Sequence, residues 1–198
     1  QPVLLKHQIK IGRDRLFDVL SANYLLVKRR KKQTITTNSY HRFKKYPNLI
    51  RNFIPTEPNQ LWVSDITYWK IATGFVYISF ITDAYSRKIV GSHVAQTMEA
   101  VETMEALKTA ISGLRKGPDC PFQLTHHSDR GMQYCSDKYV KLLQNNDIGI
   151  SMTENGDPLE NAIAERVNGI IKEEYLNDYQ VNNIMEAREL LDLVVKLY

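Results

Sequence analysis

Cysteine and long apolar runs are both scarce in this sequence. Only two of the 198 residues are cysteines, Cys120 and Cys135. Two cysteines do not make a disulfide scaffold, and their spacing is not that of a zinc site, so we expect free thiols in a cytoplasmic protein. The longest apolar stretch, Phe75 to Ile81, is interrupted by Ser79 and is too short to cross a membrane. With no signal-peptide pattern visible, we expect no membrane partner.

Charge is unevenly distributed along the chain. Residues 1–60 hold 13 Lys and Arg against 3 acids, a net of +10, whereas residues 61–198 hold 13 against 19, a net of −6. A basic arm on an acidic body favours contact between the arm and a polyanion. Solubilising charge is the plainer alternative for the basic clusters, Lys28–Lys32 and Arg42–Lys45. Interleaved aromatic residues and the net charge of the arm favour phosphate contacts by both clusters, mostly without sequence preference, and the residues singled out as DNA contacts are Arg29, Arg30, Lys31 and Lys32.

The sequence pattern changes near residue 60. Before it, one short helix is predicted from Gly12 to Leu26, followed by a polar stretch with three prolines that is typical of a linker with little packing of its own. We therefore predict two parts, a basic arm with a linker over residues 1–58 and a folded core over residues 59–198.

The core has the pattern of an α/β domain. Three runs rich in β-branched and aromatic residues come first and predict an antiparallel meander; shorter strands then alternate with helices. The strands are expected at 61–69, 75–82, 88–94, 122–128 and 148–151, and the helices at 98–114, 136–145, 159–176 and 184–198. A meander followed by alternating strands and helices predicts a mixed five-stranded sheet, three antiparallel strands and then parallel strands, flanked by helices.

Three separated acids, Asp65, Asp129 and Glu165, are the candidate catalytic and metal-binding residues. Asp65 lies within an apolar strand, where an unpaired carboxylate costs several kcal/mol and needs a metal or a cationic partner. Asp129 follows a predicted parallel strand, at the end where ligands gather in open α/β sheets, although Asp-Arg-Gly is also an ordinary turn. Glu165 lies on the polar face of a predicted helix, which is usually a solvated face.

Brought together by a fold, these three carboxylates would form a hard-oxygen cage for Mg²⁺ or Mn²⁺. Such a cage supports metal-dependent phosphoryl transfer on nucleic acids. The face of the helix that bears Glu165 also carries Asn161, Asn168 and Lys172, which are candidate DNA contacts.

Other polar residues compete for these roles. His127 shares a strand face with Asp129 and is a candidate to orient the substrate or a water molecule. The pair His126 and His127 lacks Cys or His partners at zinc spacing, so we do not expect zinc. A turn or an arginine pair accounts better for Asp83, and Glu154 is a reserve ligand in a loop.

The order of these acids resembles the catalytic plan of RNase H-like polynucleotidyl transferases. The 35 residues between Asp129 and Glu165 match the interval shared by retroviral integrases and many bacterial transposases. The surrounding blocks are similar to those of an integrase-core (DDE) transposase, and above all to the second-frame product of the IS-three group of insertion sequences. The blocks are Leu61–Tyr68, Asp83–Gly91, His127–Tyr134 and Asn161–Glu174.

The resemblance implies a function and a cofactor. It implies an RNase H-like core that cleaves and joins DNA during transposition, with two Mg²⁺ or Mn²⁺ ions when DNA is bound and with Lys172 near the scissile phosphate. It also implies transposon ends and target DNA as partners, a homo-oligomer when active, a bacterial nucleoid-associated location and no small-molecule substrate. A structure-specific nuclease of the same fold and a non-catalytic DNA-binding relic stay open as alternatives.

The chain departs from the family pattern in two ways. Glu160 stands where the family usually has Asp, but this position is not one of the three metal ligands. The front half of the family's helix-turn-helix region and a segment beyond Tyr198 have no counterpart, so residues 12–26 resemble a helix-turn-helix remnant. We expect a fragment that is truncated at its C-terminal end.

Overall fold

A computed structural model describes residues 8, 10–26, 41–114, 124–154 and 161–198. The chain divides into two compact units, Gln1–Ile35 and Thr36–Tyr198. The first unit contains the helix α2, Arg13–Ala22, which has no buried residue. Arg29, Arg30, Lys31 and Lys32, predicted to contact DNA, lie outside the described residues.

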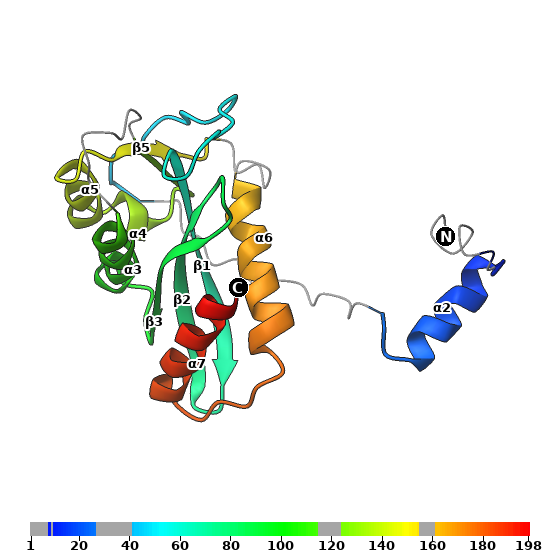
Figure 1. Cartoon of the computed structure of the whole chain (residues 1–198). Coiled ribbons are helices and arrows are strands. Elements are labelled where there is room, and N and C mark those ends of the chain that lie inside the picture. Colours follow the sequence, from blue (N-terminus) through cyan, green and yellow to red (C-terminus); the bar gives the residue numbers. More distant parts are fainter. Residues whose placement is uncertain (1–7, 9, 27–40, 115–123, 155–160) are drawn as a thin grey trace. The chain divides into compact units, whose positions relative to one another are not determined.

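The second unit is built on the predicted five-stranded sheet. Its strands are β1 (Leu61–Ile71), β2 (Gly74–Asp83), β3 (Ile89–Ala95), β4 (Thr125–Ser128) and β5 (Gly149–Met152), in the order β3-β2-β1-β4-β5 (Figure 1). β1 pairs antiparallel with β2 and parallel with β4, and β4 pairs parallel with β5. The predicted meander and mixed sheet are confirmed, and β1 lies at the centre of the sheet.

Helices cover both faces of this sheet. They are α3 (Ala100–Gly113), α4 (Met132–Cys135), α5 (Asp137–Gln144), α6 (Ala162–Ile170), the π-helix η2 (Ile171–Leu176) and α7 (Ile184–Leu197). Alternate residues of β1 point to opposite faces. Trp62 packs with residues of α3, α4 and α5, whereas Trp69 packs with residues of α6, η2 and α7. Burial on both faces explains why β1 is apolar on both of its sides.

The helices differ from the sequence prediction in two places. The predicted helix 159–176 is α-helical only to Ile170 and then continues as η2. The four-residue α4 was not expected, because it is too short to show helical periodicity. Ser136 caps α5, with its hydroxyl oxygen accepting a hydrogen bond from the Tyr139 N–H.

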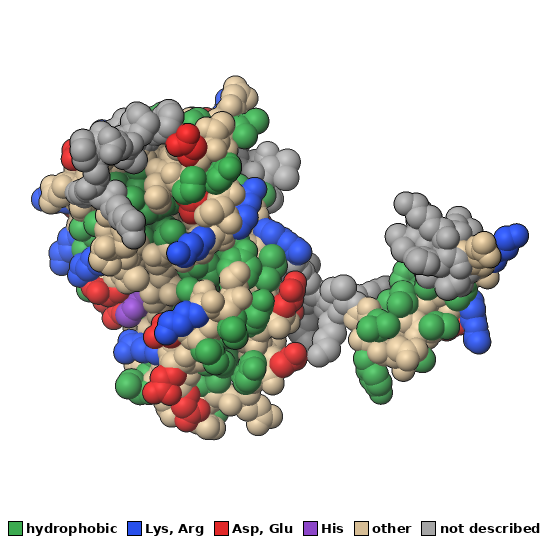
Figure 2. Space-filling view, in the orientation of Figure 1, with side chains coloured by type: hydrophobic (Ala, Val, Ile, Leu, Met, Phe, Trp, Pro, Cys, Tyr) green, Lys and Arg blue, Asp and Glu red, His purple; other side chains and the backbone are tan. Residues whose placement is uncertain are grey.

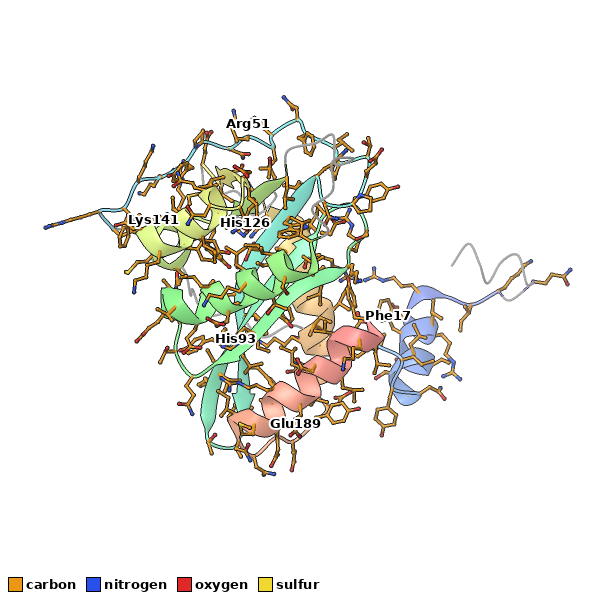
Figure 3. All side chains as sticks on the ribbon, turned by 60° about the vertical axis from the view of Figure 1, so that its left-hand side comes forward. Phe17, Arg51, His93, His126, Lys141 and Glu189 are labelled. Carbon is orange, nitrogen blue, oxygen red and sulfur yellow. The ribbon has the colours of Figure 1, made fainter. Side chains whose placement is uncertain are left out.

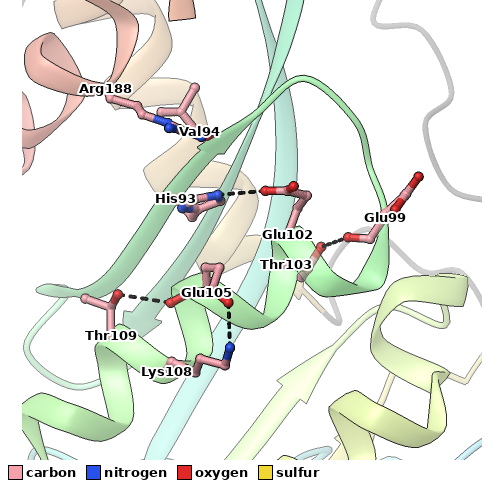
Figure 4. A network of polar contacts seen from close by, with 9 residues as sticks. All are labelled: His93, Val94, Glu99, Glu102, Thr103, Glu105, Lys108, Thr109 and Arg188. Atoms are coloured by element: carbon pink, nitrogen blue, oxygen red, sulfur yellow. Dashed lines mark hydrogen bonds and ion pairs between the residues drawn. The ribbon is translucent and has the colours of Figure 1, made fainter. Parts of the chain in front are cut away.

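The edge strand β3 is tied to a helix on each side (Figure 4). His93 Nε2 lies 2.9 Å from Glu102 Oε2 on α3, and Arg188 on α7 donates through Nε to the Val94 carbonyl at 3.1 Å. An exposed strand edge is a template for unwanted pairing, and the Arg188 bond occupies one of its acceptors.

The described part of the expected linker makes contacts with the folded core. Residues 41–58 belong to the second compact unit, Thr36–Tyr198. Backbone groups of this segment bond to the sheet, for example the Pro47 carbonyl, which accepts from the Met152 N–H at 3.2 Å. As a functional division, the boundary at residues 58 and 59 stays a prediction.

Charge on the second unit is mixed at the surface. On the face shown in Figure 2, acidic and basic side chains are interspersed with apolar ones. Within the described ranges, no helix is long and apolar enough to cross a membrane.

Candidate active site

The pairing of β1 with β4 brings two of the three predicted acids together. In this parallel register Val63 faces His127. Asp65 follows Val63 by two residues and Asp129 follows His127 by two, so the register brings both acids to the same end of β4, and the Asp129 charge acts on Asp65. Two acids that are 64 positions apart in sequence thus become neighbours through backbone hydrogen bonding.

Asp129 also has the turn role that the sequence left open. Its Oδ1 accepts a hydrogen bond from the Gly131 N–H at 2.9 Å. A Cβ at position 131 would lie 2.9 Å from the same oxygen, which is too close. A glycine at this position therefore avoids a clash that would displace the carboxylate. The turn and the catalytic interpretation are compatible, because the bond fixes the direction in which the carboxylate points.

Two asparagines fix α6 against β1. Asn161 Nδ2 donates to the Ser64 carbonyl at 3.1 Å, and Asn168 Nδ2 donates to Asp65 Oδ2 at 2.8 Å. Asn161 is 7% exposed and Asn168 6% exposed. The sequence analysis did not expect this positioning role, and the DNA contact predicted for both side chains stays a prediction that their burial does not favour. Glu165 lies on the same helix and is exposed.

The three carboxylates influence one another electrostatically. The pKa of Asp65 is raised from 3.8 to about 7, mainly by burial and in addition by the neighbouring charges of Asp129 and Glu165. Hydrogen bonds from the Ile66 backbone and from Asn168 oppose this rise. Partial desolvation also raises the pKa of Glu165. The site is therefore one in which a bound cation would be favourable.

The donor chemistry fits a divalent cation, but a complete cage is not preformed. Three carboxylates are the oxygen ligands that Mg²⁺ and Mn²⁺ prefer. Within the described residues, however, no group of three or more His, Cys, Asp or Glu side chains gathers closely enough to hold a metal ion. Asp65, Asp129 and Glu165 share a region of the protein without being arranged as ligands of one ion.

The two histidines before Asp129 are buried. His127 is 0% exposed, and its Nδ1 lies 2.8 Å from Ser151 Oγ on β5. His126 lies 3.0 Å from the Tyr139 hydroxyl, and burial lowers its pKa to about 3. These contacts join β4 to its neighbours. The contact of His127 with DNA stays a prediction that the burial of this side chain does not favour.

Lys172 lies over an aromatic ring of β1. Its Nζ is 3.9 Å from the centroid of the Tyr68 ring, a cation–π distance, and the Tyr68 ring contacts Phe75 edge-on. Tyr68 is three residues after Asp65, so the contact brings Lys172 close to the strand that carries this acid. The sequence identified Lys172 but not its aromatic partner, because a contact between a strand and a helix leaves no local signal.

The competing acids have structural partners. Asp83 Oδ1 accepts from the Ser86 N–H and hydroxyl, both at 2.7 Å, which is the predicted turn. Glu154 accepts from the Asn48 N–H and pairs with Arg51. A buried hydroxyl pair beneath the site was not predicted: Ser64 Oγ lies 3.0 Å from the Tyr134 hydroxyl. The only sign of this contact in the sequence was the alternation of β1, which places Ser64 on the same face as Trp62.

Solved structures with the same arrangement are retroviral integrases. A simian T-cell lymphotropic virus intasome structure matches with a TM-score of 0.60 and 20% identity, over 78% of this chain and 52% of that one. The HTLV-2 integrase catalytic core domain in complex with magnesium matches with a TM-score of 0.52 and 24% identity, over 71% and 83%. These likenesses establish the fold, the RNase H-like fold of integrase catalytic cores, and confirm the predicted fold class.

Sequence relatives define the family. Profiles of the integrase core domain match residues 55–158 and 146–198. The insertion element IS600 uncharacterized 31 kDa protein of Shigella sonnei is 35% identical over the whole chain and 72% of its own length. The IS629 transposase of Shigella sonnei is 33% identical over 93% of the chain. A putative IS986/IS6110 transposase of Mycobacterium tuberculosis is 39% identical over 64% of it. The chain belongs to the integrase core domain family.

The resemblance to insertion-sequence transposases that the motif blocks indicated is thereby confirmed. The chain spans 60% of the IS629 transposase and 46% of the Mycobacterium tuberculosis relative. It therefore corresponds to part of such proteins, and the integrase core domain profiles cover residues 55–198 of it.

The raised pKa of Asp65 predicts how stability depends on pH in the absence of divalent metal. The unfolded carboxyl loses its proton near pH 3.8 and the folded one near pH 7. Between these values the folded state binds more protons, so the free energy of unfolding falls as pH rises. Asp65→Asn should therefore raise Tm by several degrees at pH 8 in EDTA and by little at pH 4. Asp192→Asn, at an exposed position of α7, is the control; parallel Tm curves for wild type and Asp65→Asn would contradict the assignment.

The contact between Lys172 and Tyr68 predicts an energetic coupling. A double-mutant cycle of Lys172→Gln and Tyr68→Leu in urea denaturation should give a coupling of about 0.5–1 kcal/mol, the size of an exposed cation–π contact. Tyr68→Phe keeps the aromatic ring and therefore the contact, so the cycle of Lys172→Gln with Tyr68→Phe should give a coupling near zero. A coupling of zero in the Leu cycle, or equal values in the Leu and Phe cycles, would show that the cation–π contact contributes nothing.

Proposed function

We propose that this chain catalyses divalent-metal-dependent cleavage of DNA strands and the joining of DNA 3′ ends during transposition of an insertion sequence. The observation that carries the proposal is the electrostatic coupling of three acids from three elements. Asp65 in β1, Asp129 after β4 and Glu165 in α6 are close enough to raise the pKa of the first. The chain belongs to the integrase core domain family and is similar to insertion-sequence transposases, and phosphoryl transfer is the chemistry that three such acids fit.

Asp65, Asp129 and Glu165 would hold Mg²⁺ or Mn²⁺, and two ions when DNA is bound. The bound ions would supply activation of the attacking oxygen and neutralisation of charge at the phosphate. Asp65 must lose its proton to act as a ligand, and the hydrogen bonds from Asn168 and the Ile66 backbone favour its charged form. Asn168 also orients this carboxylate, because it holds Oδ2 at 2.8 Å.

Other residues of the chain would bind the substrate. The Lys172 ammonium carries a charge suited to a phosphate near the acids. Arg29, Arg30, Lys31 and Lys32 would contact the DNA backbone without reading sequence. We assign no covalent protein intermediate, in keeping with Cys135 being buried.

The partners and setting follow from the same reaction. Joining a transposon to a target requires transposon ends and target DNA as partners, and we propose that the active form is a homo-oligomer. The HTLV-2 integrase core was solved in dimeric and trimeric forms. We place the reaction in the bacterial cytoplasm at the nucleoid.

One observation favours a second candidate. Because no metal-binding group of three side chains is preformed within the described ranges, a DNA-binding relic without catalysis would also be compatible with the structure. A nuclease of the same fold would cleave DNA but not join 3′ ends. Strand transfer separates both from the proposed function.

The catalytic assignment predicts the effect of removing each carboxylate. Asp65→Asn, Asp129→Asn and Glu165→Gln should each lower Mg²⁺-dependent strand transfer by more than about a hundredfold. Loss of a residue that only supports a metal ligand lowers activity by at most about a hundredfold, so a larger loss indicates a ligand itself. DNA affinity, measured by fluorescence anisotropy in EDTA, should change little. The measurement is the joining of a labelled 3′ end to a plasmid target.

Matched controls are available on α7. Asp192→Asn and Glu189→Gln make the same chemical changes at exposed positions and should retain strand transfer. Retained strand transfer in any one of the three active-site variants would contradict the catalytic assignment. Cleavage without joining by the wild-type protein would instead identify a nuclease.

A further inference from the structure

The segment 41–51, which we call the strap, is fixed along the edge of β5. The Pro47 carbonyl accepts from the Met152 N–H at 3.2 Å, and the Leu49 N–H donates to Ser151 Oγ at 2.9 Å. Figure 1 shows the cyan segment that includes the strap near β5. Because β5 is the last strand of the sheet, these bonds extend the sheet's hydrogen bonding by an irregular segment.

Glu154 anchors the strap with both carboxylate oxygens. Its Oε1 accepts from the Asn48 N–H at 3.0 Å, and its Oε2 lies 2.9 Å from Arg51 Nη2. Glu154 follows β5 closely in sequence, so it joins the strap to the end of that strand. Its backbone carbonyl also accepts from Arg130 Nη1 at 2.9 Å, and Arg130 is the residue after Asp129.

The start of the strap lies beside the turn that follows β4. The His41 ring donates through Nε2 to the Arg130 carbonyl at 2.8 Å. The strap therefore begins beside the turn that contains Asp129.

The solvent side of the strap is basic. Arg42, Lys44 and Lys45 are exposed, and no acid occurs between His41 and Thr56. Two aromatic contacts lie within this segment. The ring centroids of His41 and Phe43 are 5.6 Å apart, and Lys44 Nζ is 5.0 Å from the Tyr46 ring centroid. Three cations without acids between them, fixed on a surface, suit a row of phosphates.

We propose that the strap binds the DNA backbone next to the scissile phosphate through Arg42, Lys44 and Lys45, and that Glu154 is the positioning residue that holds it there. This inference rests on the proposed function for the identity of the reacting DNA. It differs from a loose basic arm in one respect: affinity depends on the anchor as well as on the charges. An acidic protein segment is the other polyanion that this surface would accept.

The first test removes charge from the strap. Arg42, Lys44 and Lys45 are changed together to Gln in the full chain, and binding of a short fluorescein-labelled duplex of mixed sequence is measured across a salt series in EDTA. The affinity should fall at least tenfold, and the slope of log K against log salt should decrease by about 0.9 for each phosphate that the variant no longer neutralises. The control replaces the exposed Lys88, Lys108 and Lys196 by Gln, which removes equal charge elsewhere on the same unit.

The two triple variants decide the location of the DNA. Equal losses in both would overturn the strap as a binding surface, because only total charge would then matter. An unchanged duplex affinity in the strap variant, with loss of binding to a poly-Glu peptide, would identify the acidic protein segment as its partner and would also overturn the proposal.

The second test removes the anchor without removing a positive charge. Glu154→Ala makes the protein more positive, so a loose basic arm would bind duplex more tightly. A fixed strap predicts weaker binding, by about threefold or more, because ordering the freed segment on DNA now costs conformational entropy. Glu189→Ala on α7 is the matched control with the same charge change. Figure 3 labels Arg51 and Glu189 near opposite ends of this unit.

The outcomes separate the strap from the reaction. Tighter duplex binding by Glu154→Ala, equal to that of Glu189→Ala, would overturn the anchoring role. Thermal melting verifies that each variant is folded, and the strap triple variant keeps the anchors His41, Asn48 and Arg51. If the wild-type protein shows no strand transfer while the strap tests give the expected losses, the proposed function fails and the strap stands as a DNA-binding surface.

Discussion

The parallel pairing of β1 with β4 is the constraint on which the rest of the structure depends. It brings the carboxyl group of Asp65, within β1, close to that of Asp129, which directly follows β4. Two like charges in a partly desolvated place oppose folding, and the packing of the central strand on both faces holds them there. Trp62 on one face and Trp69 on the other supply part of that packing. The site therefore exists because the core around it is stable enough to tolerate it.

The helix α6 shows how the same constraint reaches the third acid. A helix that merely covered the sheet would need only apolar contacts, yet two buried asparagines bond it to β1 at Ser64 and at Asp65 itself. These two bonds fix the position of the helix along the strand and its rotation about its own axis. They thereby hold Glu165 near the paired aspartates, although its side chain is exposed. A partly assembled cage is the expected state of three acids that repel one another without a cation.

Sequence reasoning found the acids and the sheet but not the contacts that position them. The strands were predicted because β-branched and aromatic runs are local signals. Asn161 and Asn168 were expected at the surface, since a helical pattern shows which residues share a face but not what that face meets. The strap was expected to be a linker because backbone bonds to a sheet edge, such as those of Pro47 and Leu49, leave no periodicity.

The reaction that we propose would give the uneven charge of the chain an electrostatic reason. A DNA phosphate entering between Asp65, Asp129 and Glu165 would add negative charge to a group already short of compensation, so cations would have to border the site. Metal ions would supply part of this charge, and in our proposal Lys172 and the strap would supply the rest from two places that are distant in the sequence. A body with a net charge of −6 over residues 61–198 could not attract DNA by its average field. The position of the duplex would then depend on these local cations rather than on the overall charge.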